Sequence, residues 1–177
     1  MLPVGSTPVK EDELPEITPF LWFDDQAEEA AAFYVSLFPN SRIEQIVRYG
    51  EAGPGPTGSV MTVRFSLDGA PFTALNGGPA HYGFDESISF VVSCASQEEV
   101  DRYWTALTEG GEEIACGWCK DRYGLRWQIV PAGLKELLAD PDPARAARAT
   151  QAMLAMKKLD LEAMRQAAAG GLREASA

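Results

Sequence analysis

The residues whose types could carry chemistry are few, and the first of them is a Cys-x-x-Cys pair, Cys116 and Cys119. Such a pair is redox-active at a helix N-terminus, or it supplies half of a zinc site, for which Cys94 and His81 would be further ligands. The pattern around the pair is that of strands and a turn, which does not favour a reactive thiolate. We therefore interpret the pair as structural. His81 has no recognisable acidic or hydroxyl partner for general-base chemistry, so we interpret it as a loop residue.

Composition and charge exclude several classes of function. The chain has 177 residues and a formal net charge of −11, so its surface repels phosphate groups. We expect no nucleic-acid partner and no membrane partner, since no apolar stretch is long enough to span a bilayer. Three cysteines are an odd number and do not suit a disulfide framework. We therefore expect a cytoplasmic protein.

A strand followed by a helix occurs twice along the chain. In the first copy the apolar segment 17–23 predicts a strand, and Asp25 with Glu28 predicts the cap of the helix that follows. In the second copy the segment 87–94 predicts the strand, and Ser96 with Glu99 predicts the cap of the following helix. The aromatic and leucine positions of the two helices match at one constant offset of 70 residues, which indicates a duplicated unit.

Three strand-like runs follow each helix. In the first copy they are 42–49, 59–67 and 71–75, and in the second copy they are 112–115, 117–120 and 125–130. Asp68-Gly69 is a hairpin signal between the last two runs of the first copy. The sequence therefore predicts an α+β fold, with two βαβββ modules that form a cupped, mainly antiparallel sheet around a cleft.

The predicted organisation has three parts. They are a flexible N-terminal tail (1–16), the paired modules (17–131, divided into 17–78 and 87–131) and a C-terminal helical extension (132–177). Within the extension we expect a short helix over 133–139 and a long Ala- and Met-rich helix over 144–169. The long helix packs on the domain or on a partner subunit in our interpretation, and a partner- or lipid-binding helix is the alternative.

Several short motifs, taken in order, resemble the PhnB-like branch of the vicinal oxygen chelate superfamily. They include Ile17-Thr18-Pro19-Phe20-Leu21-Trp22-Phe23, Phe38-Pro39-Asn40-Ser41, Ala74-Leu75-Asn76-Gly77-Gly78, Lys120-Asp121-Arg122-Tyr123-Gly124, Trp127-Gln128-Ile129-Val130-Pro131 and Met153-Leu154-Ala155-Met156-Lys157-Lys158-Leu159-Asp160. The superfamily includes glyoxalase I and the bleomycin and fosfomycin resistance proteins. Members of this branch often carry the name 3-demethylubiquinone-9 3-methyltransferase, and the resemblance implies a homodimer.

The resemblance also implies where a metal would bind. The superfamily usually holds a divalent ion through His, Glu or Gln in the first and last strand of each module. The matching positions here are Ile17, Thr73, Ser87 and Gln128. Only the amide oxygen of Gln128 is a plausible ligand, and nothing supplies charge to offset dehydration of the ion. We therefore expect no metal. We also expect no cofactor, because the glycine-rich first turn of common S-adenosylmethionine-dependent folds is missing.

Successive side chains of a strand point to opposite faces, so residues two positions away from these sites should also line the cleft. The candidate residues for binding a small organic ligand are Ile17, Pro19, Leu21, Thr73, Leu75, Asn76, Ser87, Ser89, Trp118 and Gln128, with Asn76 and Trp118 at the rim. The residues expected to face the helices as core are Phe20, Trp22, Phe72, Phe90 and Trp127. Such a lining suits a neutral or aromatic ligand. The alternative is a cleft that side chains fill.

These observations predict a small-molecule-binding PhnB-like protein without a metal. The alternative is an enzyme of the same superfamily, either a methyltransferase, as the family name says, or a glyoxalase-like isomerase or dioxygenase. A purely structural dimer module is the third interpretation.

Overall fold

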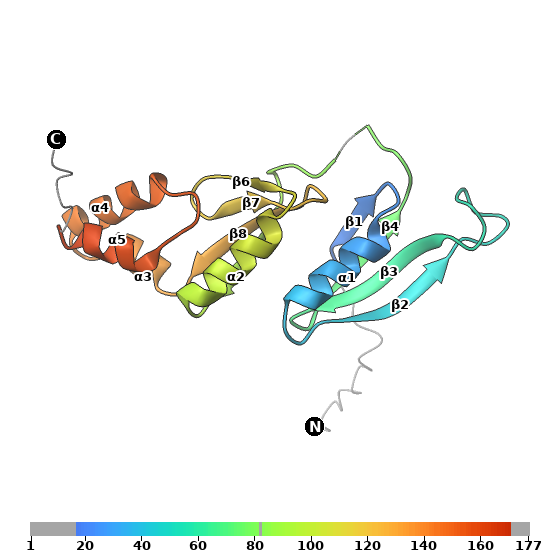
Figure 1. Cartoon of the computed structure of the whole chain (residues 1–177), viewed down its shortest axis with the longest axis horizontal. Coiled ribbons are helices and arrows are strands. Elements are labelled where there is room, and N and C mark those ends of the chain that lie inside the picture. The colour runs from blue at the N-terminus through green and yellow to red at the C-terminus, as the bar shows by residue number, and fades with distance from the viewer. Residues whose placement is uncertain (1–16, 82, 171–177) are drawn as a thin grey trace, which may run out of the picture. The chain divides into compact units, whose positions relative to one another are not determined.

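The computed structural model of this chain describes residues 17–81 and 83–170, and the predicted tail over 1–16 lies outside them. The chain divides into two units, residues 1–79 and 80–177, and each is described by itself. Each unit begins with the order strand, helix, strand, strand, strand and contains a four-stranded sheet (Figure 1). The predicted α+β fold with two βαβββ modules is confirmed.

The first unit consists of β1 (Phe20–Phe23), α1 (Ala27–Leu37), β2 (Arg42–Arg48), β3 (Val60–Leu67) and β4 (Ala70–Asn76). The strand order in its sheet is β1-β4-β3-β2, with β1 parallel to β4 and the other two pairs antiparallel. Both central residues of the β3–β4 hairpin, Asp68 and Gly69, have positive φ angles (47° and 79°), as the primed hairpin turns require.

Helix α1 covers one face of this sheet because its inner side is made of small residues and one large ring. Ala27, Ala30 and Ala31 are fully buried and let the helix backbone approach the strands closely. The ring of Tyr34 then stacks on Phe65 with centroids 6.5 Å apart, and Phe65 stacks on Phe72 at 5.4 Å. This aromatic row forms the core between α1 and the sheet.

The second unit begins with β5 (Phe90–Cys94), α2 (Gln97–Thr108), β6 (Glu112–Glu113), β7 (Trp118–Lys120) and β8 (Arg126–Pro131). The strand order is β5-β8-β7-β6, with β5 parallel to β8. Helix α2 buries Val100, Tyr103, Trp104 and Leu107. Trp127 and Ile129 of β8 are also buried, while Phe90, predicted as core, is half-buried and lies 5.6 Å from the Trp127 ring.

The first turns of α1 and α2 are capped by different hydrogen bonds. The predicted cap of α2 is confirmed: the Glu99 N–H donates to Ser96 Oγ (3.3 Å), and the Glu99 side chain accepts from the Ala95 N–H (2.7 Å). The predicted cap of α1 at Asp25 is wrong. The cap residue is Gln26, whose side chain makes no capping hydrogen bond. Instead, Asn76 at the end of β4 accepts from the Ala27 N–H through its side-chain oxygen (2.7 Å).

The C-terminal part forms three helices, α3 (Leu134–Leu138), α4 (Pro143–Leu154) and α5 (Leu161–Ala168). The prediction of one long helix over 144–169 is wrong, because the chain leaves the helix to pair with the second sheet. The carbonyls of Met156 and Lys157 accept from the N–H groups of Cys116 (2.8 Å) and Gly117 (2.7 Å). Leu159 in the same segment is fully buried.

These C-terminal helices pack around a core of Leu134, Leu159 and Met164, and Val130 of β8 packs against that core. They therefore belong to the second unit. Among the helices of residues 17–81 and 83–170, none has the length and apolar character needed to cross a membrane.

Candidate functional site

The first sheet has one face that α1 does not cover. The parallel register of β1 and β4 pairs Phe20 with Thr73 and Trp22 with Leu75, so these four side chains point to the same side. Phe20 is 59% exposed and Trp22 is 38% exposed, whereas Thr73 and Leu75 are half-buried. We call these four residues the first open face.

The sequence prediction for β1 is wrong about which side chains point to this face. Leu21, predicted to line the cleft, is only 5% exposed and points toward the helix side. Phe20 and Trp22, predicted as core, lie on the first open face. Ile17 and Pro19 precede β1 rather than forming part of it. Thr73 and Leu75 of β4 lie as predicted, opposite the buried Phe72.

The error has a physical cause in the loop between strand and helix. The helices begin at Ala27 and Gln97, so the helix offset is 97 − 27 = 70. The strands end at Phe23 and Cys94, so the strand offset is 94 − 23 = 71. The first unit therefore has one additional residue between strand and helix. A shift of one residue moves every side chain of a strand to the opposite face.

The second sheet presents a comparable face. Gln128 on β8 lies between Val91 on β5 and Trp118 on β7, with direct register pairing to both. The Gln128 amide donates a hydrogen bond to Ser89 Oγ (2.9 Å). Val91 is 59% exposed, and the other three side chains are half-buried. We call these four residues the second open face, and it unites three predicted ligand-binding residues, Ser89, Trp118 and Gln128.

Ser87 is not part of this face. It lies before β5 in a turn, where its backbone N–H donates to Asp85 Oδ1 (2.9 Å) and its hydroxyl donates to the same oxygen. These hydrogen bonds lower the pKa of the Asp85 carboxyl. The hydroxyl of Ser87 is therefore committed to the turn.

The four positions that the superfamily uses for a metal do not fit a divalent cation. Ile17 is 97% exposed and offers no donor atom, and the Ser87 hydroxyl is committed to Asp85. Gln128 and Thr73 are neutral, and a divalent ion in a protein is normally held by anionic or imidazole ligands. Across residues 17–81 and 83–170, no three His, Cys, Asp or Glu side chains gather in a way that could hold a metal ion.

The cysteines of the Cys-x-x-Cys motif have separate environments. Cys119 is fully buried in β7, whereas Cys116 lies in the preceding turn with a φ angle of 57°. Burial raises the pKa of the Cys119 thiol to about 12 and that of the Cys94 thiol to about 11. All three cysteines are free. Cys94 and Cys119 are therefore protonated at neutral pH, which agrees with the structural interpretation of the motif.

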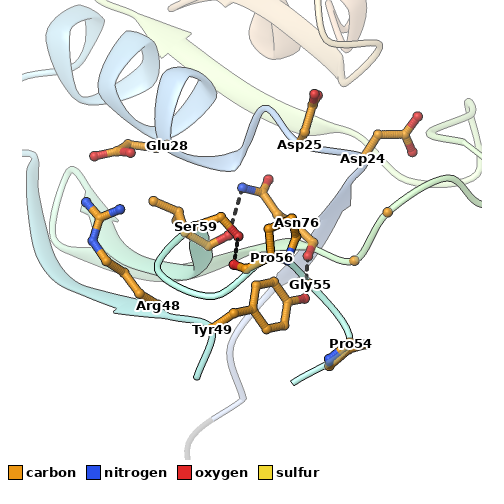
Figure 2. Close-up of a pocket in the computed structure, with 13 residues that line it drawn as sticks. Asp24, Asp25, Glu28, Arg48, Tyr49, Pro54, Gly55, Pro56, Ser59 and Asn76 are labelled. Carbon is orange, nitrogen blue, oxygen red and sulfur yellow. Dashed lines mark hydrogen bonds between the residues drawn. The ribbon is translucent and has the colours of Figure 1, made fainter. Parts of the chain in front are cut away.

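A pocket of about 560 Å³ lies at one end of the first unit, where the β1–α1 loop, the 50–58 loop and the residues after β4 meet (Figure 2). It is lined by Asp24, Asp25, Glu28, Arg48, Tyr49, Pro54, Gly55, Pro56, Ser59, Val60, Asn76, Gly77 and Gly78. Asn76 is the only predicted candidate among them. The glycine- and proline-rich loop over 50–58 is the sequence signal for this pocket, although its composition alone indicates only a connection between strands.

Asn76 shapes the pocket rather than standing free at its rim. Its side-chain oxygen accepts from the Ala27 N–H (2.7 Å), and its side-chain nitrogen donates to the Val60 carbonyl (3.1 Å). The Tyr49 hydroxyl donates to the Asn76 carbonyl (2.6 Å). One residue thereby connects β4 to the start of α1, the start of β3 and the end of β2.

Comparisons with known proteins identify the family. Residues 15–130 match the family described as 3-demethylubiquinone-9 3-methyltransferase. Among solved structures, a PhnB protein from Bacillus cereus is 36% identical with a TM-score of 0.63, and the match covers 67% of this chain and all 100% of that one. Protein PA1353 from Pseudomonas aeruginosa is 23% identical with a TM-score of 0.56, covering 67% of this chain and 98% of that one, which supports the fold alone. No curated protein matches the chain.

The family match spans both βαβββ modules and ends before α3. It therefore covers well over half of the sequence, and the Bacillus cereus relative is spanned along its whole length. The chain therefore belongs to the 3-demethylubiquinone-9 3-methyltransferase family, of which the PhnB protein from Bacillus cereus is a relative of known structure.

Proposed function

We propose that the open face of each sheet of this chain binds a small neutral organic molecule without the help of a divalent metal. The observation that carries the proposal is the exposure of apolar side chains there: Phe20 and Val91 are each 59% exposed, and Trp22 is 38% exposed. Apolar side chains gathered on one face of a sheet mark a surface that binds something. Gln128, Ser89 and Thr73 add neutral hydrogen-bonding groups that would orient a ligand.

The charges around the second open face support a neutral ligand over a phosphorylated one. Arg126 and Lys120 are register neighbours at the edge of the second open face. Arg126 pairs with Glu86 at 2.8 Å, and Lys120 pairs with Glu112 at 2.5 Å. The nearby cations are thus already compensated, so an anionic ligand would have to compete with these carboxylates.

The donor chemistry supports binding without a metal. The metal positions of the superfamily hold no carboxylate and no imidazole here, and Gln128 offers only a neutral amide oxygen. A site of neutral oxygen donors does not offset the dehydration of a divalent cation. We therefore infer that a ligand contacts the protein side chains directly.

Thermal-shift titration with a methoxy-substituted benzoquinol tests the proposal. We expect a saturable rise in the unfolding temperature that EDTA leaves unchanged. Trp118→Ala should reduce the rise, because it removes the largest ring of the second open face. Leu154→Ala is the matched control: Leu154 is 62% exposed, lies on α4 and belongs to neither open face. A quinol effect that is absent, or that both variants reduce equally, contradicts the proposal.

The second candidate is an enzyme, and the family match favours it. The family name specifies a methyltransferase, which would need S-adenosylmethionine. Both sheets are mixed and antiparallel-rich, unlike the doubly wound parallel sheets with a glycine-rich turn that bind dinucleotides and related cofactors. A large thermal shift with S-adenosylmethionine, together with transfer of its methyl group to the quinol, would establish the enzyme and overturn the binder.

We also propose that the chain acts as a homodimer in the cytoplasm. Exposed apolar residues outside the open faces, Ile43 and Ile46 on the edge strand β2, support a partner subunit, because an exposed apolar edge favours association. Three free cysteines support a reducing compartment. The net charge of −11 supports the absence of a nucleic-acid partner. Light scattering on the purified chain would test the dimer, and a monomeric mass would contradict it.

A further inference from the structure

The pocket at the end of the first unit shares no lining residue with either open face, and contacts that only glycine permits build its walls. A Cβ atom on Gly55 would lie 2.4 Å from the Tyr49 ring, and one on Gly53 would lie 2.7 Å from it. The loop over 50–58 therefore lies directly against Tyr49. The Tyr49 ring is in turn fixed by its hydroxyl bond to the Asn76 carbonyl.

Backbone hydrogen bonds fix the opposite wall. The Gly77 and Gly78 N–H groups donate to the carbonyls of Phe23 (3.0 Å) and Asp24 (3.1 Å). Asn76 meanwhile secures the first residue of α1. The loop that carries Asp24 and Asp25 is thus attached to β4 and to α1 at its two ends. The pocket is therefore preorganised, and a ligand would not have to order its walls.

The charges of this pocket are both unpaired and opposite in sign. Asp24, Asp25 and Glu28 supply carboxylates, and Arg48 supplies a guanidinium (Figure 2). Arg48 donates one hydrogen bond, from Nη1 to the Gly58 carbonyl (3.1 Å), which leaves most of its donors available. Within the described parts of the chain, none of the four side chains forms a salt bridge.

A pocket with unpaired charges of both signs points to a ligand that carries both signs. A metal ion would not use the guanidinium, and these carboxylates are not grouped as metal ligands among the described residues. We infer that the pocket binds a small organic molecule with ammonium groups and one carboxylate, the chemistry of a basic amino acid. The carboxylates at 24, 25 and 28 hold the ammonium groups, and Arg48 holds the carboxylate in the paired geometry that guanidinium favours.

The volume and the charge balance support this class. Three carboxylates and one guanidinium leave an excess of two negative charges, and a ligand with two ammonium groups and one carboxylate has a net charge of +1, which offsets half of that excess. About 560 Å³ is within the usual range for small-molecule sites. This inference does not depend on the proposed function, because it uses none of the residues of the open faces.

Isothermal titration calorimetry of the full chain with L-lysine tests the inference, with cadaverine as the comparison ligand. Cadaverine has the two ammonium groups but lacks the carboxylate. We expect saturable binding of L-lysine that is at least about tenfold tighter than that of cadaverine. Arg48→Gln should remove this preference, because it removes the partner of the carboxylate. Absence of saturable L-lysine binding up to about 10 mM, or equal affinity for the two ligands, overturns the inference.

A charge-matched pair of double variants separates the pocket from the overall acidity of the chain. Asp24→Asn with Asp25→Asn should weaken L-lysine binding about tenfold. Asp68→Asn with Glu136→Gln removes the same charge at exposed positions outside the pocket lining and outside the 50–58 loop, and should leave binding within about twofold. Glu28 is left intact because a carboxylate in the first turn also stabilises α1. Equal weakening by both double variants would mean non-specific attraction and would overturn the inference, and the thermal midpoint of each variant shows that it is folded.

Discussion

Asp121 is a buried carboxylate, 2% exposed, that belongs to the turn between β7 and β8. Its Oδ1 accepts from the N–H groups of Tyr123 (2.9 Å) and Leu125 (3.0 Å), and its Oδ2 accepts from Trp127 Nε1 (2.8 Å). These bonds close the turn and direct the Trp127 ring to the helix side of β8. Asp121 therefore stabilises the fold. Because neighbouring side chains of a strand point to opposite faces, Gln128 then points to the second open face.

Replacement of this carboxylate should destabilise the chain strongly. Asp121→Ala leaves the Trp127 indole and two backbone N–H groups without an acceptor, so we expect a loss of about 3 kcal/mol in the free energy of unfolding. Asp121→Asn keeps one oxygen and should lose less. Urea denaturation measures both, and Glu51→Ala, an exposed acid, should change the value by less than about 0.5 kcal/mol. Equal effects for the buried and exposed sites would contradict the assigned role.

The buried thiols give the stability a pH dependence in the alkaline range. The ordinary thiol pKa is 9.0, whereas burial raises the pKa of Cys94 to about 11 and that of Cys119 to about 12. Below pH 9 these thiols are protonated in both states and add no pH dependence. Above it, the unfolded chain releases the protons first, so stability falls as pH rises toward those values.

Cys119→Ala removes one of these two groups and should make the decline shallower. Urea midpoints of wild type and variant at neutral pH and at several values above pH 9 measure the difference in slope. Other groups that titrate in this range, such as lysines, are common to both proteins and cancel in the comparison. Parallel declines would show that Cys119 is not protected from ionisation by the fold.

At the scale of the elements, the hydrophobic pattern was sufficient to place the strands and the helices of both modules, and the capping signal was correct for α2 but not for α1. The repeat did not predict which side chains of β1 point away from the helix. The two helices match at an offset of 70 residues, whereas the two strands match at an offset of 71. The pocket was not predictable either, since its lining comes from loops and strand ends that only the folded backbone brings together. The break between α4 and α5 likewise depends on distant partners, Cys116 and Gly117.

Glycine at position 111 is required for the connection between α2 and β6. A Cβ atom there would lie 2.1 Å from the Lys120 carbonyl oxygen and 3.0 Å from the Asp121 backbone, and backbone atoms cannot move aside cheaply. We expect Gly111→Ala to lower the free energy of unfolding by about 2 kcal/mol or more. Gly50→Ala is the control, because nothing lies within 4 Å of its Cβ position, and it should be close to neutral. Similar results for the two glycines would contradict the close approach of the two backbone segments at Gly111.

The Asn76 side chain holds elements of the first unit together, whereas the Ser96 side chain caps a single helix of the second unit. Asn76→Ala removes the acceptor for the Ala27 N–H and the donor to the Val60 carbonyl, whereas Ser96→Ala removes one cap acceptor. We expect losses of about 2 kcal/mol and about 1 kcal/mol in the free energy of unfolding, respectively. Chemical denaturation followed by circular dichroism measures both. A smaller loss for Asn76→Ala than for Ser96→Ala would contradict its role as a connector.

At the scale of the whole molecule, the C-terminal helices are part of the second unit rather than an appendage. The segment between α4 and α5 bonds to the turn before β7, the Leu159 carbonyl accepts from the Gln97 side chain (3.0 Å), and Lys158 pairs with Asp101 at 2.5 Å. The family match ends at residue 130, so the C-terminal partners in these contacts lie beyond the matched region. The second sheet therefore depends on residues beyond the part that defines the family.

Two leucines close together in sequence test this dependence. Leu159 is fully buried, so Leu159→Ala should cost about 3 kcal/mol in the free energy of unfolding. Leu154 is 62% exposed, and Leu154→Ala should cost less than about 0.5 kcal/mol. Thermal and urea unfolding measure the two losses. Nearly equal losses would show that the C-terminal helices are not integral to the second unit.

On our proposal, the open faces bind a neutral organic ligand without a divalent metal. The most direct measurement is the affinity of the purified chain for a methoxy-substituted benzoquinol, determined by calorimetry with and without EDTA. We predict saturable binding with the same affinity in both conditions. Binding that EDTA abolishes and an added divalent metal restores, or no binding at all, would contradict the claim.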